Sequence, residues 1–268
     1  MMGKMSVFLG LQISQSLRGI FLNQSKYALK IIKKYGVETS DPMDTPMVEK
    51  SKLDADPKGK EVDPTRYRGM IGSLVYLTAS RPELVFGVCM YARYQAKPTK
   101  KHLHAVKRIF LYLHRNIKYG SVVSEGFLHC INAFVDTDHA GCLYTRRSTS
   151  GSMQLLGDIL VSWSSKKQNN TAISSTKAEY IALSGCFAIC CNNVQHSRSK
   201  HIDIRYHFIK EQVENEVVEL YFVRTEYQLE NILTKALGRE RLEFLINKHV
   251  MRSMSPEMLK SLAVEEEE

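Results

Sequence analysis

The hydrophobic pattern of the chain changes near Gly120, and this change constrains the fold more than any other feature of the sequence. Before it, apolar residues recur at helical spacing in three segments: about 66–78, 82–94 and 100–114. After it, short β-rich runs are separated by turns: 131–136, 152–156, 159–163 and 217–223. We therefore expect a mixed α+β and α/β chain of two domains, with a boundary at about residues 115–125.

Each half also contains elements of the other kind. Near the N-terminus, the runs 7–13 and 20–22 predict a hairpin, and a helix follows it as far as Gly36. In the second half a capped helix begins after 174–176. Further helical patterns come later in the chain: 202–214, 225–237 and 239–251.

The chain is basic. It has 37 Lys and Arg against 28 Asp and Glu, a formal charge of +9 at pH 7, although four of the acids form the terminal run 265–268. A body this basic suits a polyanionic partner, above all nucleic acid, although the charge equally suits a chain that is merely soluble. No apolar run reaches the roughly 18 residues that a membrane span needs, so we expect no membrane partner.

Six cysteines without a Cys-x-x-Cys pair argue against a zinc site and against a disulfide scaffold. Free thiols in a reducing compartment are the simpler expectation. The N-terminus lacks the apolar core of a signal peptide. We therefore expect an intracellular protein, and nothing in the sequence selects nucleus over cytoplasm.

Two carboxylates are placed where a metal site could form. Asp136 lies at the end of a predicted strand, and Glu179 lies on the helix that follows the strands. Paired acids from a strand and a neighbouring helix can hold Mg²⁺ for phosphodiester chemistry, because this ion prefers hard oxygen ligands. The pattern alone leaves open the alternative that both are solvated surface residues.

Several longer strings occur in one order over nearly the whole chain. In the first half they are Phe8–Ile13, Gly19–Tyr27 and Tyr67–Thr78. In the second half they are Asp136–Gly141, Arg147–Gly151, Ser162–Gln168, Ser174–Ala182, Lys200–Phe208 and Gln228–Lys235. In these strings the chain resembles the C-terminal part of copia-type LTR retrotransposon Pol polyproteins, where reverse transcriptase joins RNase H.

The resemblance implies two domains and a tail. Residues 1–118 would be the end of a reverse transcriptase, with a primer-positioning hairpin and then a helical thumb and connection. Residues 119–251 would be an incomplete RNase H-like mixed sheet with helices, and residues 252–268 an acidic tail. The family's Tyr-x-Asp-Asp polymerase string does not occur, so we expect no nucleotide polymerisation.

RNase H domains hold two Mg²⁺ ions with four carboxylates and hydrolyse the RNA strand of an RNA–DNA hybrid. The resemblance assigns Asp136 to the first-strand acid and Glu179 to the helix acid, both as metal ligands and catalytic residues. It gives Asp138, in the same string as Asp136, at most an electrostatic role.

The chain departs from the family pattern at two places. Between Ile189 and Arg198 it lacks the strand that carries the third acid and most of the next helix. Asn231 stands at the position of the last acid, and Glu230 would be turned away by about 100° on a helix. The missing strand would also leave backbone groups of the first strand unpaired. With two of four carboxylates left, we expect weak Mg²⁺ binding and little or no cleavage.

Nucleic-acid binding can persist without cleavage. Two segments near the first and third strands carry donors that suit a sugar-phosphate backbone: Arg147, Ser148, Lys166, Lys167 and Gln168. The resemblance makes an RNA–DNA hybrid the expected partner. Two other functions stay open, namely an active Mg²⁺-dependent RNase H-type ribonuclease and a non-catalytic protein-interaction fragment.

Overall fold

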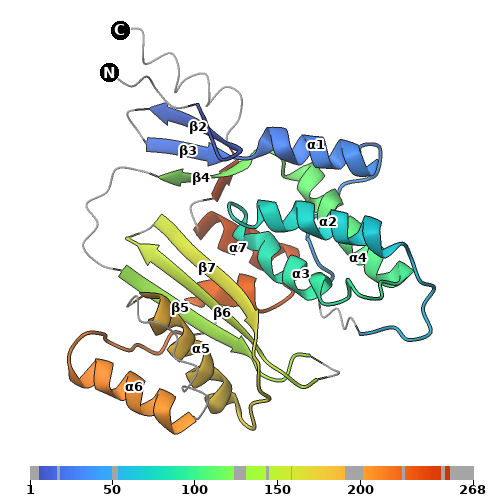
Figure 1. Cartoon of the computed structure of the whole chain (residues 1–268). Coiled ribbons are helices and arrows are strands. Elements are labelled where there is room, and N and C mark those ends of the chain that lie inside the picture. Colours follow the sequence, from blue (N-terminus) through green and yellow to red (C-terminus); the bar gives the residue numbers. More distant parts are fainter. Residues whose placement is uncertain are drawn as a thin grey trace, which may run out of the picture. The chain divides into compact units, whose positions relative to one another are not determined.

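The chain forms two compact units (Figure 1). The first takes in residues up to His129, Gly157–Ile159 and everything from Ala236 onward, and the second takes in Cys130–Leu156 and Leu160–Lys235. The structure is a computed structural model, and it describes residues 6–16, 19–49, 54–123, 131–142, 145–157, 159–190, 202–224, 227–248 and 251–253. The reverse-transcriptase and RNase H-like identities expected for residues 1–118 and 119–251 stay predictions.

Four helices build the core of the first unit: α1 (Ser25–Tyr35), α2 (Pro64–Leu77), α3 (Pro82–Ala92) and α4 (Lys100–Arg115). The structure confirms the helices that the apolar spacing predicts. On α4, Val106, Ile109 and Leu113 are buried at spacings of three and four residues, so one face of this helix packs inward. Tyr67 of α2 is also fully buried, and its hydroxyl donates a hydrogen bond to the Tyr91 carbonyl oxygen at 2.9 Å.

Local signals in the sequence fix where these helices begin and end. Asp63 caps α2, because its carboxylate accepts hydrogen bonds from the backbone N–H groups of Thr65 (2.9 Å) and Arg66 (3.1 Å). Gly36 ends α1 in the left-handed conformation, with φ at 67°. Both signals are local, which is why the sequence predicts the first half well.

A five-stranded sheet lies in the same unit, in the order β1 (Val7–Phe8), β2 (Leu11–Ser16), β3 (Gly19–Asn23), β4 (Tyr119–Val123) and β8 (Met251–Ser253). Its pairings are antiparallel, and β2 and β3 form the predicted N-terminal hairpin. Gly120 of β4 is required here, since a Cβ atom at this position would lie 2.3 Å from the Leu22 carbonyl oxygen. The last strand of the sheet comes from the far end of the chain.

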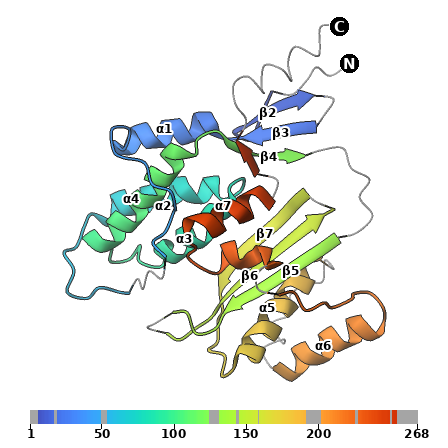
Figure 2. The same cartoon turned by 180° about the vertical axis from the view of Figure 1, so that it is seen from behind.

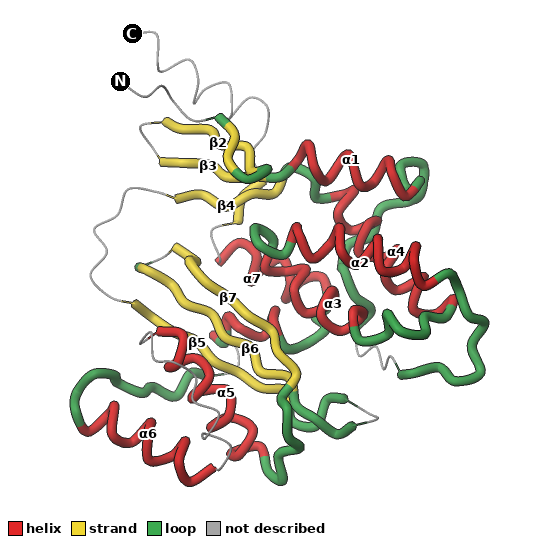
Figure 3. The backbone as a smooth tube through the Cα atoms, viewed as in Figure 1, coloured by secondary structure: helices red, strands yellow, loops and turns green. Residues whose placement is uncertain are grey.

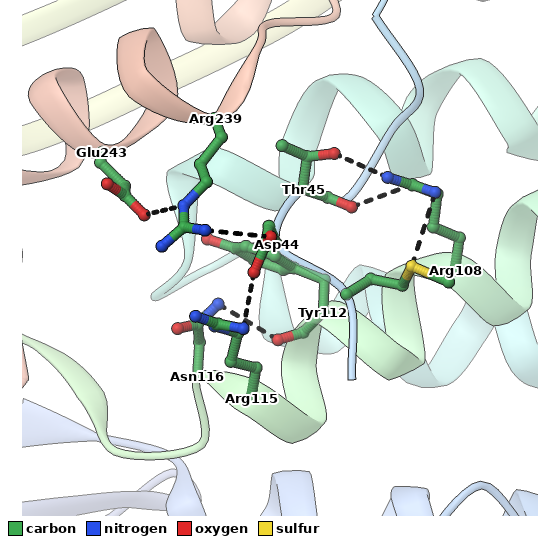
Figure 4. Close-up of polar contacts among 9 residues, drawn as sticks. Asp44, Thr45, Arg108, Tyr112, Arg115, Asn116, Arg239 and Glu243 are labelled. Carbon is green, nitrogen blue, oxygen red and sulfur yellow. Dashed lines mark hydrogen bonds and ion pairs between the residues drawn. The ribbon is translucent and has the colours of Figure 1, made fainter. Parts of the chain in front are cut away.

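Asp44 joins three segments of the first unit (Figure 4). Its Oδ1 lies 2.6 Å from Nη1 of Arg115 at the end of α4. Its Oδ2 lies 3.2 Å from Nη1 of Arg239, the first residue of α7 (Arg239–Lys248), and Arg239 also pairs with Glu243 at 2.8 Å. One carboxylate therefore ties the loop after α1 to both α4 and α7.

The second unit contains a three-stranded sheet and the helical elements around it. The strands are β5 (Ile131–Asp138), β6 (Thr149–Leu156) and β7 (Ile159–Lys167), in that order. The helical elements are α5 (Ser175–Cys190), α6 (Ile202–Glu214) and the short 3₁₀ helix η2 (Leu229–Leu233). Figures 1 and 2 show α5 on one face of the sheet and η2 on the other. Gly157 begins the turn between β6 and β7 with φ at 60°, and the next residue, Asp158, lies outside the described residues.

Two expected elements of this unit are wrong. Residues 217–223 form a loop after α6 instead of a strand (Figure 3), and Tyr221 and Phe222 are 78% and 94% exposed. A strand needs a hydrogen-bonded neighbour, and among the described residues β5 pairs with β6 alone. The helix expected over 225–237 shortens to η2, with residues 225–226 outside the described part of the chain.

The described residues therefore form a mixed α+β fold with two small sheets. The mixed parallel and antiparallel sheet expected for the second half is absent from the described residues, where β5 and β6 pair antiparallel. None of the described helices has the length and apolar character that a membrane crossing requires.

Candidate functional site around Asp136

The side chain of Asp136 points to the face of the sheet that η2 covers. Asp136 on β5 lies opposite Gly151 on β6, and directly opposed residues share a face. A Cβ atom at Gly151 would lie 2.6 Å from Cγ2 of Thr234 and 3.1 Å from Cβ of Leu233. The end of η2 and the two residues that follow it therefore lie directly over this part of the sheet.

Helix α5 covers the other face. Gln154 lies three residues after Gly151 and so points the opposite way, and its Nε2 lies 3.4 Å from Sγ of Cys186 on α5. Gln168, just after β7, donates from Nε2 to the Ala178 carbonyl oxygen at 2.8 Å and to Oγ of Ser150 at 2.9 Å. These bonds hold α5 against the sheet.

Asp136 is engaged by two residues that the sequence did not single out. The Thr234 hydroxyl donates a 2.5 Å hydrogen bond to Oδ2 of Asp136, and Nζ of Lys235 lies 3.0 Å from the same oxygen. Nζ of Lys235 also donates to Oδ1 of Asn231 at 2.6 Å. Only 12% of the Asp136 side chain is exposed, whereas 42% of the Lys235 side chain is exposed, so the ion pair lies at the edge of the buried region. The structure thus brings Asp136 and Asn231 together through one ammonium group.

Glu179 lies on the opposite layer. It is exposed on α5, whereas its neighbours Ala178 and Ala182 are buried against the sheet. Within the part of the chain that the structure describes, no three or more His, Cys, Asp or Glu side chains gather in a way that could hold a metal ion. The structure does not assemble the expected acids into one cluster.

The other two acids of these strings are in structural positions. Asp138 accepts a hydrogen bond at Oδ1 from the backbone N–H of Thr149, which closes the loop between β5 and β6. Glu230 is 2% exposed and Asn231 4% exposed, so both lie inside the unit.

The two basic segments lie side by side. The backbone N–H of Gln168 donates to the Ser148 carbonyl oxygen at 2.8 Å, which places the segment after β7 against the loop before β6. Lys166 and Arg146 are exposed at this end of the sheet, and Arg147 and Lys167 are half-buried; together we call these four residues the basic end. Positive charge from separate parts of the sequence therefore gathers in one place.

Two of the expected nucleic-acid contacts are buried. Ser148 is fully buried, and its Oγ accepts a hydrogen bond from the Ala140 backbone N–H at 3.0 Å. Gln168 is 5% exposed and is bonded to Ser150 and Ala178 as described above. In this structure both side chains hold the basic end in shape rather than facing solvent.

Comparison with known proteins decides the family. The Retrovirus-related Pol polyproteins from transposons RE1 and RE2 of Arabidopsis thaliana are 34% and 35% identical to the chain over 272 and 263 residues. These alignments cover 90% and 87% of the chain. The chain belongs to the copia-type retrotransposon Pol polyproteins. The Pol family resemblance of the sequence strings is thereby confirmed.

The alignments also define how much of a Pol polyprotein is present. The chain spans about a fifth of the RE1 and RE2 polyproteins, 19% and 18% of their lengths. An uncharacterized mitochondrial protein of Arabidopsis thaliana is 36% identical over 182 residues, which cover 68% of the chain and 75% of that protein. No protein-family model and no solved structure matches the chain.

Lys235 is the residue of this candidate site that reasoning from the sequence missed. It lies in the string Gln228–Lys235 and follows Asn231 by four residues, about one helical turn. That spacing is the signal that could have found it, since it allows a lysine ammonium to reach the Asn231 amide. The contact with Asp136 joins residues 99 positions apart and leaves no trace in the local sequence.

Proposed function

We propose that the second unit of this Pol polyprotein fragment is a degenerate RNase H-like module that binds the backbone of an RNA–DNA hybrid without Mg²⁺-dependent cleavage. One observation supports this most: Asp136 of β5 is neutralised by Lys235, beside a neutral Asn231 at the position of a second acid. The residues present therefore do not fit a Mg²⁺ pair.

The chemistry of the donor set explains the poor fit. Mg²⁺ needs near-ideal octahedral oxygen ligation and is bound through carboxylates. At Asp136 one carboxylate oxygen already accepts from a hydroxyl and an ammonium, and Asn231 offers only an amide oxygen to the same ammonium. A divalent ion would have to displace these donors and approach a fixed positive charge.

Binding has separate support in the basic end. Arg146, Arg147, Lys166 and Lys167 carry four positive charges within two neighbouring segments. Such a cluster contacts phosphates irrespective of base sequence, and the affinity comes mainly from counterion release. The basic character of the whole chain, with a formal charge of +9, adds to this attraction.

The test is a binding and cleavage assay on the full chain with a labelled RNA–DNA hybrid. We expect saturable binding. The logarithm of the association constant should fall linearly with the logarithm of the salt concentration. The double variant Lys166→Ala/Lys167→Ala should reduce that slope by about one to two units, because each lost phosphate contact removes about 0.9. The control Lys210→Ala removes an exposed lysine that pairs with Glu214 on α6, and it should leave the slope nearly unchanged.

In the same assay we expect no cleavage in Mg²⁺ beyond that seen in a chelator. Mg²⁺-dependent cutting that disappears in Asp136→Asn would overturn the proposal and favour the active ribonuclease. Binding that does not change with salt would also overturn it, because phosphate contacts cannot be independent of salt.

A further inference from the structure

The ammonium of Lys235 lies between two oxygens that come from different elements. Its Nζ is 3.0 Å from Oδ2 of Asp136 on β5 and 2.6 Å from Oδ1 of Asn231 on η2. These two positions are the ones that the resemblance assigns to a metal ligand and to a lost acid. A single positive charge therefore lies between the two side chains that would otherwise help to hold a metal ion.

We propose that Lys235 is a built-in cation that takes the place of a divalent ion and closes η2 onto β5 without metal. This inference deepens the proposed function and rests on it for the identity of the site. One carboxylate and one amide carry a charge of −1, which a single ammonium balances. A divalent ion at the same place would leave excess positive charge beside a second cation.

Two donors contact the same carboxylate oxygen of Asp136. The Thr234 hydroxyl and the Lys235 ammonium both donate to Oδ2, so the contacts of this oxygen are occupied. Thr234 is 1% exposed and the Asp136 side chain 12% exposed, so these two side chains lie largely out of water, whereas the Lys235 side chain is 42% exposed. Charge-assisted bonds of this kind are about twice as strong as neutral ones.

Lys235 also has an advantage over a free ion because it belongs to the chain. It follows Thr234 and lies four residues after Asn231, so folding of η2 delivers the charge to the site. A free ion must be drawn from solution at millimolar concentration, whereas a tethered group acts at a high effective concentration. The segment is therefore closed at any Mg²⁺ concentration.

The first experiment measures Mn²⁺ binding to the full chain by electron paramagnetic resonance and calorimetry, with Mn²⁺ as the probe. We expect no Asp136-dependent binding in the wild type. The double variant Lys235→Met/Asn231→Asp removes the ammonium and adds an acid, and it should bind Mn²⁺ about tenfold or more tightly than the wild type. Adding Asp136→Asn to it should abolish the gain, and Lys210→Met, at an exposed lysine on α6, should behave like the wild type.

The outcomes separate this inference from the proposed function. Wild-type Mn²⁺ binding that Asp136→Asn abolishes would overturn the inference even if no hybrid were cleaved. Failure of the double variant to bind Mn²⁺ would also overturn it, since Lys235 would then not be what excludes the ion. Hybrid cleavage, by contrast, tests the proposed function in its own assay.

A second measurement uses the wild type alone and so does not depend on whether a variant folds. The reactivity of each lysine towards an amine-labelling reagent is followed by mass spectrometry with and without Mn²⁺. The Lys235 ammonium is paired with Asp136 and Asn231, so it should react more slowly than that of Lys166, and Mn²⁺ should not change its rate. An increase for Lys235 in Mn²⁺ would show that the ion displaces the ammonium, and the inference would fail.

Discussion

Gly151 leaves the space in which the η2 segment packs against the sheet. It lies opposite Asp136, on the face that Thr234 and Leu233 cover. Any side chain there would occupy the space of these two residues, and it would move Thr234 away from the Asp136 carboxylate. The contacts of Lys235 and Thr234 with Asp136 therefore depend on a glycine in the neighbouring strand.

We predict that Gly151→Val lowers the free energy of unfolding of the second unit by about 1–3 kcal/mol, the usual cost of overpacking a filled site. The matched control is Gly185→Ala, where nothing lies within 4 Å of a Cβ atom on α5. This change should be neutral or stabilise by up to about 1 kcal/mol, because alanine favours a helix. Urea unfolding followed by the fluorescence of Trp163 on β7 measures both. Equal effects of the two substitutions would contradict the packing seen at Gly151.

At this scale the sequence predicts positions better than contacts. The strings single out Asp136 and Asn231, and the structure brings both to one ammonium group, whereas their role in a site stays a prediction. They do not show Lys235 as their link, since a lysine one turn after an asparagine is common on any helical segment. They also offer Ser148 and Gln168 as free donors, whereas both are buried and bonded within the unit. Burial of a polar side chain depends on tertiary packing that one strand pattern does not record.

Ion pairs of Asp44 connect elements that are distant in the sequence (Figure 4). Arg115 ends α4 and Arg239 begins α7, and both meet the same carboxylate from the loop after α1. The Asp44 side chain is 39% exposed, so water screens each pair and neither is strong by itself. Together they hold the first turn of α7 close to the end of α4 and to the loop after α1.

We predict that Asp44→Ala increases hydrogen exchange of the α7 backbone amides and lowers the stability of the first unit by about 1 kcal/mol, as expected for two partly exposed pairs. Glu243→Gln is the control, because it removes only the pair with Arg239 within α7. That pair is worth roughly 0.3–0.5 kcal/mol. Hydrogen exchange with mass spectrometry resolves α7 from the other helices. If Asp44→Ala left α7 exchange unchanged while Glu243→Gln raised it, the tether would not act through Asp44.

Elements follow the sequence where their signals are local. The helices of the first half have apolar residues at helical spacing and recognisable caps such as Asp63, and both act within a few residues. The 217–223 segment has the composition of a strand, but a strand forms only beside a partner, and the described residues provide none. Because no neighbouring strand covers this segment in the described residues, the side chains of Tyr221 and Phe222 are exposed.

The two units differ in what fills their cores. The first buries three tyrosines, Tyr67, Tyr91 and Tyr112, each less than 2% exposed. Burial raises the pKa of all three hydroxyls, that of Tyr91 to about 12, because the charged phenolate would be desolvated. The described residues of the second unit include Tyr221 and Tyr227, both exposed. Nothing in the sequence alone assigns α7 and β8 to the first unit either, because that return of the chain rests on contacts between its distant ends.

These tyrosines predict an alkaline transition that belongs to the first unit. A folded-state pKa above the unfolded value of about 10 stabilises the fold fully below pH 10, and this stability is lost as the pH rises towards 12. For Tyr91 alone the loss approaches about 3 kcal/mol at full ionisation. Urea unfolding at pH 9, 10 and 11, followed by helical circular dichroism, should show a falling midpoint, and tyrosinate absorbance should appear together with the loss of helix. Tyr227→Phe, at a 62% exposed site, should leave this pH dependence unchanged. If all tyrosines ionised near pH 10 while the helices stayed intact, Tyr67, Tyr91 and Tyr112 would not be buried in a closed core, and the packing of α2, α3 and α4 would be wrong.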